Sequence, residues 1–455
     1  MRLAALLHER ERLGEPVRVG LVGAGKFGTM YLAQARRTPG VHVLGVADLS
    51  RKRARDALTC AGWAPDRCKA SSFREALDAG TTHVTDEAER LIAAPGLEVV
   101  IDATGSPGAA IRHALLAAEH RRHMVMATVE ADALAGPLLA LRAAEAGTIY
   151  SLAYGDQPAL VCELVDWART SGFPVVCAGK GTKYLPGYHA STPDTVWGHY
   201  GLSPARAAAG GLNPRMFNSF LDGTKSAIEM AAVANATGLA PPEDGLCFPP
   251  AGAGELAERL CPRDAGGVLE TAGMVEVVSS LERDGRPVAD DLRWGVFVTF
   301  EAGSDYVADC FSEYGLGTDR SGRYACLYRP FHLIGLELGV SVASVAVRGE
   351  ATGAPEAWRA DVVAVAKRDL RSGEQLDGEG GFMVWGKLLP AQRAREGGWL
   401  PIGLAHGVTM TRAVKAGELV RWSDVMIDEG DDTVAIRLRM EEMFGRAPDP
   451  ARALG

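Results

Sequence analysis

Short β-branched runs alternate with alanine-rich stretches over the first third of the chain. Each run has the length of a strand, is bounded by glycine or polar residues, and is followed by a stretch long enough for a helix. This alternation is typical of a parallel sheet covered by helices, so it predicts an α/β protein with a doubly wound sheet. The strands are expected at residues 17–22, 41–47, 99–103 and 123–127.

The first expected strand leads into the glycine-rich turn Gly23-x-Gly25-x-x-Gly28 and then into a helix. In a dinucleotide-binding fold the first glycine permits the tight turn, the second lets the backbone approach a pyrophosphate, and the third permits close packing of helix on strand. Amide groups at the start of that helix favour the phosphate charge. The sequence therefore predicts a dinucleotide-binding domain, with Lys26 and Phe27 also at the cofactor.

Asp48 ends the second expected strand, 20 positions after Gly28. At this place the fold positions a carboxylate that binds the adenosine ribose, which favours NAD. Ser50, Arg51 and Arg53 follow directly and could instead hold the 2′-phosphate of NADP. From these residues alone the choice between NAD and NADP stays open.

Thr104 and Gly105 follow the strand expected at residues 99–103. The carboxyl ends of parallel strands form the edge at which ligands bind in such sheets. We therefore expect Thr104 and Gly105 to line the nicotinamide half of the cofactor. The alternative is an ordinary turn between a strand and a helix.

Length and charge limit the architecture and the partners. A chain of 455 residues predicts two or three domains, placed at residues 1–150 for dinucleotide binding, 151–350 for catalysis and oligomerisation, and 351–455. A net charge of −9, without a basic patch interleaved with aromatic residues, argues against a nucleic-acid partner. Eight cysteines without paired spacing indicate reduced thiols.

No apolar stretch is long enough for a membrane span, and the apolar run at residues 3–7 is too short for a signal peptide. We therefore expect a soluble, cytoplasmic protein without a membrane partner. A homodimer is expected only from the general frequency of such assemblies.

Residues 179–197 concentrate lysine, histidine, hydroxyl and carboxylate side chains in a segment broken by glycine and proline. The interruptions predict an irregular surface segment. Lys180, Lys183, His189 and Ser191 supply the groups needed to hold an anionic, polyhydroxylated substrate. The alternative is a solvated loop without a ligand.

Residues 217–235 predict one alanine-rich helix. One face of this helix carries three charged residues at i, i+3 and i+7, namely Asp222, Lys225 and Glu229. Ser219, in the same segment, is a candidate substrate-binding residue. Few charges interrupt this otherwise small and apolar run. That pattern favours a buried functional cluster over an exposed, salt-bridged stripe.

These residues suit the reduction of a carbonyl group. A lysine would orient or donate a proton at the oxygen while hydride arrives from the nicotinamide, with Lys225 as the first choice and Lys183 as the second. His189 is a further candidate. Asp222 and Glu229 could orient the lysine, or could bind a divalent cation that polarises the carbonyl.

The C-terminal part begins after a boundary at residues 348–356. Before it, His332 is a candidate substrate ligand that could equally be structural, and the apolar residues 340–347 could pack back against the first domain. Beyond it, residues 366–376 and 411–420 each couple a basic residue, a Gly-Glu turn and an apolar return. This repeat predicts a small pseudo-symmetric β-rich unit, which resembles an SAF domain.

Three segments, 179–197, 213–235 and 328–339, resemble the DXR-like oxidoreductases. Members of that family are similar to homoserine dehydrogenase in their first two domains and end in an SAF domain. The resemblance implies conversion of 1-deoxy-D-xylulose 5-phosphate to 2-C-methyl-D-erythritol 4-phosphate, an early step of isoprenoid synthesis. It also implies NADPH, which tips the cofactor choice slightly toward NADP, and a divalent cation, Mg²⁺ or Mn²⁺.

The same resemblance implies roles for individual residues. Lys180, Lys183 and His189 would lie near the anionic group of the substrate, and Asp222 or Glu229 would lie near the metal. The reaction needs the cation to bridge neighbouring oxygens and needs basic groups for the phosphate.

Two other functions stay open from the sequence. A homoserine-dehydrogenase-like or sugar-acid oxidoreductase would transfer hydride without rearranging a carbon skeleton. A nucleotide-sensing protein would bind the cofactor without turnover and report to a partner through the SAF-like unit. Metal dependence, a phosphate requirement and turnover itself distinguish the three functions.

Overall fold

The computed structural model describes residues 2–428 and 430–445. The chain divides into two compact units, and neither is continuous in sequence. Unit 1 comprises Met1–Glu163 and His332–Glu356, and unit 2 comprises Leu164–Phe331 and Ala357–Gly455. The SAF-like segment therefore shares a unit with the middle of the chain, whereas the division at residues 150 and 350 stays a prediction.

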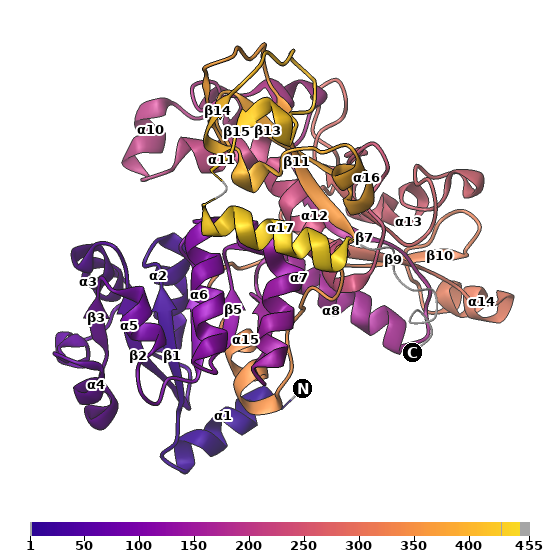
Figure 1. Ribbon diagram of the computed structural model, residues 1–455. Helices are drawn as coiled ribbons and strands as arrows, with labels where there is room; N and C mark the ends of the chain where they lie inside the picture. The colour runs from indigo at the N-terminus through magenta and orange to yellow at the C-terminus, as the bar shows by residue number, and fades with distance from the viewer. Residues whose placement is uncertain (1, 429, 446–455) are drawn as a thin grey trace. The chain divides into compact units, whose positions relative to one another are not determined.

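Unit 1 is built on a six-stranded sheet of order β3-β2-β1-β4-β5-β6 (Figure 1). Every neighbouring pair in it is parallel. The chain order reverses between β1 and β4, which is the switch point at which such sheets bind dinucleotides. The strands are β1 (Val17–Val22), β2 (Val41–Ala47), β3 (His83–Thr85), β4 (Val99–Asp102), β5 (His123–Met126) and β6 (Tyr150–Leu152).

The α/β class and all four predicted strands are confirmed. The bounds of β1 and β2 are those expected, and β4 and β5 each end one residue earlier. Helices α2, α3 and α15 pack together, while α5, α6 and α7 pack in a separate series. The helices of unit 1 are α1 (Leu3–Arg12), α2 (Lys26–Ala35), α3 (Arg51–Cys60), α4 (Phe73–Ala79), α5 (Ala88–Ile92), α6 (Pro107–Glu119) and α7 (Val129–Glu145).

The apolar segment before the predicted boundary returns to the first sheet, as expected. Helix α15 (Gly339–Ala343) continues into a π-helical turn at Ser344–Arg348. Val342 and Val345 are buried in the same core cluster as Leu21 of β1 and Leu32 of α2. Unit 1 is thus completed by residues that follow Leu164–Phe331 of unit 2 in sequence.

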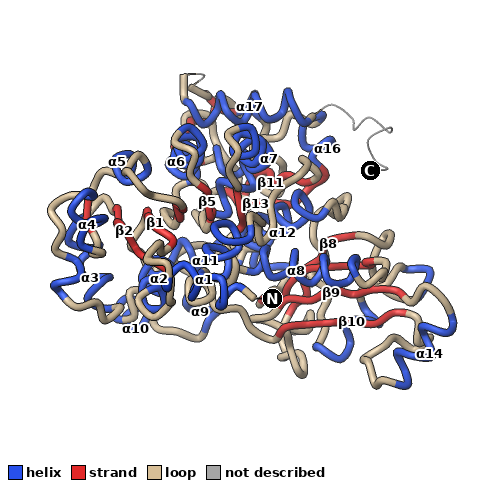
Figure 2. Tube along the Cα trace, turned by 90° about the horizontal axis from the view of Figure 1, so that it is seen from below, coloured by secondary structure: helices blue, strands red, loops and turns tan. Residues whose placement is uncertain are grey.

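Unit 2 contains a four-stranded mixed sheet of order β10-β9-β7-β8. Figure 2 shows β9 and β10 side by side. Strand β7 pairs parallel with β8 and antiparallel with β9. The strands are β7 (Val175–Thr182), β8 (Met274–Ser279), β9 (Val296–Glu301) and β10 (Tyr324–Arg329).

The prediction of an irregular segment from residue 179 is wrong for its first part, because β7 continues to Thr182. Gly179 and Gly181 are required here by close neighbours. An added Cβ would lie 1.8 Å from the Glu276 carbonyl oxygen and 1.9 Å from the Leu292 carbonyl oxygen, respectively. Lys180 therefore projects from a rigid strand between two glycines that pack against backbone.

The prediction of one helix over residues 217–235 is also wrong, because two helices are present. Helix α11 (Pro214–Leu221) ends before Asp222, and α12 (Thr224–Thr237) begins after Gly223. Gly223 has φ +91°, a left-handed conformation that interrupts the helix at little cost only for glycine. Asp222 therefore lies in a turn, whereas Lys225 and Glu229 share α12.

The SAF-like segment packs on α12 through β11 (Ala360–Ala366) and β13 (Val384–Pro390). Its two repeat copies face each other, because Leu370 and Val414 exchange both backbone hydrogen bonds. The same side-chain contact recurs in each copy. Glu374 accepts from the Arg371 N–H at 2.7 Å, and Glu418 accepts from the Lys415 N–H at 2.9 Å. The copies are thus related by the predicted pseudo-symmetry.

The remaining elements of the described chain complete the two units. They are α8 (Gln157–Thr170), α9 (Val196–Tyr200), α10 (Pro204–Ala209), α13 (Leu256–Arg259), α14 (Asp305–Glu313), β12 (Gln375–Asp377), α16 (Ala391–Glu396), β14 (His406–Met410), β15 (Val425–Met426) and α17 (Asp432–Phe444).

Candidate functional site

The glycine turn after β1 leaves its backbone accessible at one position. Gly23 has φ +98°, and an added Cβ would lie 2.4 Å from the Ala103 carbonyl oxygen. A Cβ on Gly28 would lie 2.2 Å from the Gly23 carbonyl oxygen, so α2 packs directly on the turn. At Gly25, which precedes the first residue of α2, a Cβ would meet no atom within 4 Å. This open space adjoins the amide groups of the first turn, where Lys26 is exposed and Phe27 is half-buried.

Substituting Gly25 separates cofactor binding from folding. Gly25→Val is expected to fold normally, because φ −74° and ψ −162° suit any residue and the space is free. The branched side chain would fill the place of a pyrophosphate and weaken NADH binding at least about tenfold, or about 1.4 kcal/mol. Gly28→Val is the matched control, and it should lower the melting temperature by overlap with the turn. Unchanged NADH affinity of Gly25→Val in calorimetry would refute this placement.

The Asp48 carboxylate ties the glycine turn to the start of α3. Its Oδ2 accepts from the Ala24 N–H at 3.0 Å, and its Oδ1 accepts from the Ser50 N–H at 2.9 Å. Arg53 forms an ion pair with Oδ1 at 2.6 Å. Burial raises the pKa of Asp48, but the hydrogen bonds from Arg53 and the backbone outweigh it, so the pKa lies below its usual value. Asp48 is therefore a charged carboxylate at neutral pH.

A second carboxylate, Asp102 at the end of β4, organises the turn that follows. Its Oδ1 accepts hydrogen bonds from the Thr104 N–H at 3.1 Å and from the Thr128 hydroxyl at 2.6 Å. Gly105, with φ +68°, donates its N–H to the Thr128 hydroxyl at 3.0 Å. His113 Nδ1 lies 2.7 Å from Oδ2. The buried carboxylate of Asp102 thus fixes the turn of Thr104 and Gly105, which is predicted to line the nicotinamide.

In unit 2, Lys180 of β7 and Glu229 of α12 form a buried ion pair. Their side chains are 6% and 4% exposed. Lys225 precedes Glu229 by one helical turn and is half-buried. Between them, the Ser226 hydroxyl is buried without a hydrogen-bond partner among the described residues. Strand and helix thus pair an ammonium group with a carboxylate in the interior of unit 2, and Lys225 precedes that carboxylate by one turn of α12.

Lys183 belongs to a separate cationic group around Tyr200. Its ammonium donates to the His199 carbonyl oxygen and lies 5.4 Å from the centre of the Tyr200 ring. The Arg293 guanidinium lies 5.5 Å from the same ring. Burial, followed by the charge of Arg293, lowers the pKa of Lys183. Within the described chain neither cation forms an ion pair with a carboxylate, so this cluster has the charge to attract an anion.

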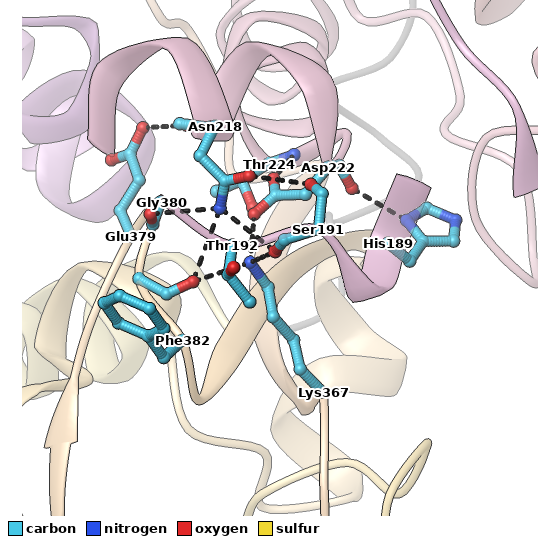
Figure 3. A network of polar contacts seen from close by, with 12 residues as sticks. His189, Ser191, Thr192, Asn218, Asp222, Thr224, Lys367, Glu379, Gly380 and Phe382 are labelled. Atoms are coloured by element: carbon cyan, nitrogen blue, oxygen red, sulfur yellow. Dashed lines mark hydrogen bonds and ion pairs between the residues drawn. The ribbon is translucent and has the colours of Figure 1, made fainter. Parts of the chain in front are cut away.

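Asp222 pairs with a lysine of the SAF-like segment (Figure 3). The Lys367 ammonium donates to Asp222 Oδ2 at 2.7 Å and to the carbonyl oxygens of Ser191 and Gly381, each at 2.8 Å. The Asp222 and Lys367 side chains are 0% and 2% exposed. Burial raises the pKa of Asp222, and the charge and hydrogen bond of Lys367 oppose that rise. Asp222 thus fastens the turn before α12 to the SAF-like segment.

Two further predicted residues belong to this same junction. The Ser191 hydroxyl donates to Asn218 Oδ1 at 2.7 Å, and the Asn218 amide donates to the Gly380 carbonyl oxygen at 3.1 Å. Ser219 donates to the Glu379 carboxylate. The structure therefore groups Ser191, Ser219 and Asp222 with residues 377–382, apart from the pair of Lys180 and Glu229. Their substrate-binding role stays a prediction.

His189 lies against the aromatic side chain of Trp385, with ring centroids 3.7 Å apart. Its Nδ1 lies 2.7 Å from the Asp222 carbonyl oxygen, and its Nε2 lies 2.8 Å from the Tyr184 hydroxyl. Burial lowers the pKa of His189 to about 4, so the ring is neutral at pH 7. His332, by contrast, is half-buried in unit 1.

The donor set does not fit the predicted metal site. In the part of the chain that the structure describes, no group of three or more histidine, cysteine, aspartate or glutamate side chains could hold a metal ion. Asp222 and Glu229 each pair with a different lysine, so a cation would have to displace an ammonium group from a buried carboxylate. A metal role for Asp222 and Glu229 stays a prediction from the sequence and from the resemblance.

Sequence reasoning missed Lys367, Arg293 and Asp102. Lys367 is a basic residue of the first repeat copy, and nothing in the sequence around it indicates which carboxylate it pairs with. Arg293 lies in a loop before β9 with no motif around it, and Asp102 looks like the last residue of an ordinary strand. Only the charge of Asp102 within an apolar run could have indicated its role.

Two family models match the chain. Residues 155–338 match the model described as "Oxidoreductase DRL, catalytic domain". This part of the chain is therefore similar to the catalytic domain of an oxidoreductase. Unit 1 has the Rossmann-like architecture of NAD(P)-binding domains. Residues 361–426 match the SAF domain, which confirms the interpretation of the repeat.

Solved structures of dehydrogenases match this chain at low similarity. A probable dehydrogenase from Thermotoga maritima is 14% identical, over 73% of this chain and 90% of that one, with a TM-score of 0.38. The WlbA dehydrogenase from Bordetella pertussis, solved with NADH and UDP-GlcNAcA, is 17% identical over 37% of this chain, with a TM-score of 0.27. DOX-P reductoisomerase with magnesium is 14% identical, over 48% of this chain and 57% of that one, with a TM-score of 0.32.

The chain spans about half the length of WlbA, 48% of that chain. Sequence comparison with curated proteins gave no match. Among the helices that the structure describes, none is both long and apolar enough to cross a membrane.

Proposed function

We propose that this protein is an oxidoreductase that transfers hydride between a nicotinamide dinucleotide and a small, anionic, polyhydroxylated compound such as a sugar acid or sugar phosphate. In the reducing direction, hydride adds to the carbonyl carbon, a proton adds to its oxygen, and the cofactor leaves oxidised. The observation that carries the proposal is the buried pair of Lys180 and Glu229 beside Lys225, inside the segment matched by an oxidoreductase catalytic domain. Paired charges are retained in such a place chiefly for chemistry or positioning.

Lys225 is the proposed proton donor to the carbonyl oxygen. Glu229, one turn later on α12, pairs with Lys180 and holds its ammonium in place. Lys183 is the second candidate, because it belongs to the cationic group around Tyr200 and not to the helix that carries Glu229. The cationic group of Lys183 and Arg293 around Tyr200 is the proposed seat of the anionic group of the substrate.

NAD(H) is the proposed cofactor in preference to the NADP(H) that the resemblance implies. Asp48 is buried and charged where the adenosine ribose binds in this fold, so a 2′-phosphate would be repelled there. Arg53 pairs with Asp48, and Arg51 pairs with Asp86 at 2.8 Å. The ion pair of Arg51 with Asp86 is exposed and weak, so a phosphate could replace Asp86. The negative charge of Asp48 would still repel that phosphate.

Removing the charge of Asp48 is expected to change the cofactor preference. Asp48→Ser frees Arg53 and lifts the repulsion, so the ratio of NADPH to NADH affinity should rise about tenfold, or about 1.4 kcal/mol. Asp56→Ser, on the exposed side of the same helix α3, is the control and should leave the ratio unchanged. Fluorescence titration of both cofactors measures it. A native protein that already prefers NADPH would contradict the proposal.

The function is tested by following nicotinamide absorbance with candidate substrates. The purified protein is mixed with NADH or NADPH and a panel of sugar-derived ketones, sugar acids and sugar phosphates, with and without Mn²⁺. We expect turnover of an anionic compound without added cation. Chemical reduction of the carbonyl group of that compound should abolish the turnover. Consumption of NADPH by 1-deoxy-D-xylulose 5-phosphate only with the cation would instead assign the rearranging reaction implied by the resemblance. Tight cofactor binding without turnover of any member would favour the nucleotide sensor.

A further inference from the structure

The SAF domain contains a cavity of about 590 Å³ that the proposed function does not use. It is lined by two indole side chains, Trp385 and Trp399, and by the cations Lys387, Arg412 and Arg421. This volume lies within the range of sites that hold small organic ligands. Trp385 and Lys387 are two residues apart on β13 and therefore point to the same side of the strand. They also line an adjoining cavity of about 260 Å³, together with His189 and Phe248.

The cavity has cationic groups in excess of available carboxylates. The ammonium of Lys387 forms no hydrogen bond and no ion pair with the described residues, and burial lowers its pKa. The Arg421 guanidinium lies 4.4 Å from the centre of the Trp399 ring and has no carboxylate partner in the described chain. The lining holds two acids, of which one is paired with a cation. Asp424 pairs with Arg412, and Glu418 accepts from the Lys415 N–H at 2.9 Å.

The two repeat copies differ where the cavity lies. Arg421 occupies the position in the second copy that Asp377 occupies in the first, counted from the matched pair Leu370 and Val414. Asp377 faces the catalytic segment, because Arg215 donates to its carbonyl oxygen at 2.7 Å. One copy therefore anchors the SAF domain to the catalytic segment, and the other presents cations and an indole to an open cavity.

We propose that this cavity binds a small organic anion, a carboxylate or phosphate ester with a body of sugar size, as a second ligand of the protein. Lys387 and Arg421 would hold the charged group, and the indole rings of Trp385 and Trp399 would cover the apolar face of the body. The site is distinct from the pair of Lys180 and Glu229. It adjoins the junction of the SAF domain through the stack of Trp385 on His189. The inference does not rest on the proposed function.

Isothermal titration calorimetry of the full chain without cofactor or substrate tests this proposal. The probes are 6-phosphogluconate, gluconate and inorganic phosphate, which separate the carboxylate from the phosphate. We expect at least one to bind with a Kd below about 1 mM. Lys387→Met and Arg421→Met should each weaken that binding about tenfold or more. Arg371→Met is the control, since Arg371 is exposed on the first repeat copy outside the cavity, and it should bind as the native chain does.

Equal melting temperatures and near-ultraviolet circular dichroism establish that the variants are folded. Trp399→Phe, which retains an aromatic ring, should bind more weakly than the native chain and more tightly than Arg421→Met. Absence of binding by all three probes would overturn the proposal. Binding that neither Lys387→Met nor Arg421→Met weakens would also overturn it, because the anion would then lie elsewhere. Both results are independent of turnover, so they leave the hydride-transfer proposal standing.

Discussion

Lys225→Met is expected to lower kcat by about 10²–10⁴-fold while the chain folds and binds NADH as before. Methionine matches the length and apolar stem of lysine but cannot donate a proton to the carbonyl oxygen. Because the proton is transferred in the transition state, the loss should appear in kcat more than in KM. Steady-state kinetics with the substrate identified in the panel, together with calorimetric NADH binding, measures both effects.

Lys183→Met is the matched comparison for the proton donor. Lys183 is assigned to the anionic group of the substrate, so its substitution should raise KM with a smaller effect on kcat. Arg293→Met should behave in the same way, because both cations lie over Tyr200. If Lys183→Met instead abolished turnover and Lys225→Met retained it, the order of the two candidates would be reversed.

Lys180→Met is expected to destabilise unit 2 by about 3–5 kcal/mol, because it leaves the Glu229 carboxylate buried without its partner. Adding Glu229→Gln removes the unpaired charge and should restore most of that loss. Turnover should stay low in the double variant, since neither group of the pair remains. Urea denaturation followed by circular dichroism measures the free energy of unfolding, and kinetics on the same samples measures activity.

The exposed pair of Lys52 and Asp56 on α3 is the control for this experiment. Its side chains are 84% and 62% exposed, so Lys52→Met should change stability by less than about 1 kcal/mol. A double variant of Lys180 and Glu229 with native turnover would show that the buried pair is only structural. That result would remove the observation on which the proposed function rests.

The first sheet could be predicted closely from the sequence because its signals are local. A β-branched run, a glycine turn and an acidic residue at a fixed spacing each act within a few residues of the chain, and β1 and β2 have the expected bounds. The return of Val342 and Val345 to this core could be suspected only from their apolar character. The repeat of the SAF domain was recognisable because both copies retain the same turn.

The elements of the catalytic segment were harder to predict because their causes lie far away in sequence. Gly179 and Gly181 look like loop residues until Glu276 and Leu292 are seen to pack against them. Gly223 looks like a tolerable glycine within a helix, although its positive φ divides that helix. In the same way, spacing placed Asp222 with Lys225, whereas its actual partner, Lys367, follows 145 residues later.

Hydride transfer from NADH to the substrate is tested by following an isotope label from the cofactor. The protein is incubated with NADH carrying deuterium at the transferable position of C4 and with the substrate found in the panel, and the product is analysed by mass spectrometry and NMR. One deuterium is expected on the carbon that was the carbonyl carbon, and Lys225→Met should slow its appearance. A product formed without deuterium on that carbon, while the cofactor keeps its label, would contradict hydride transfer by this protein.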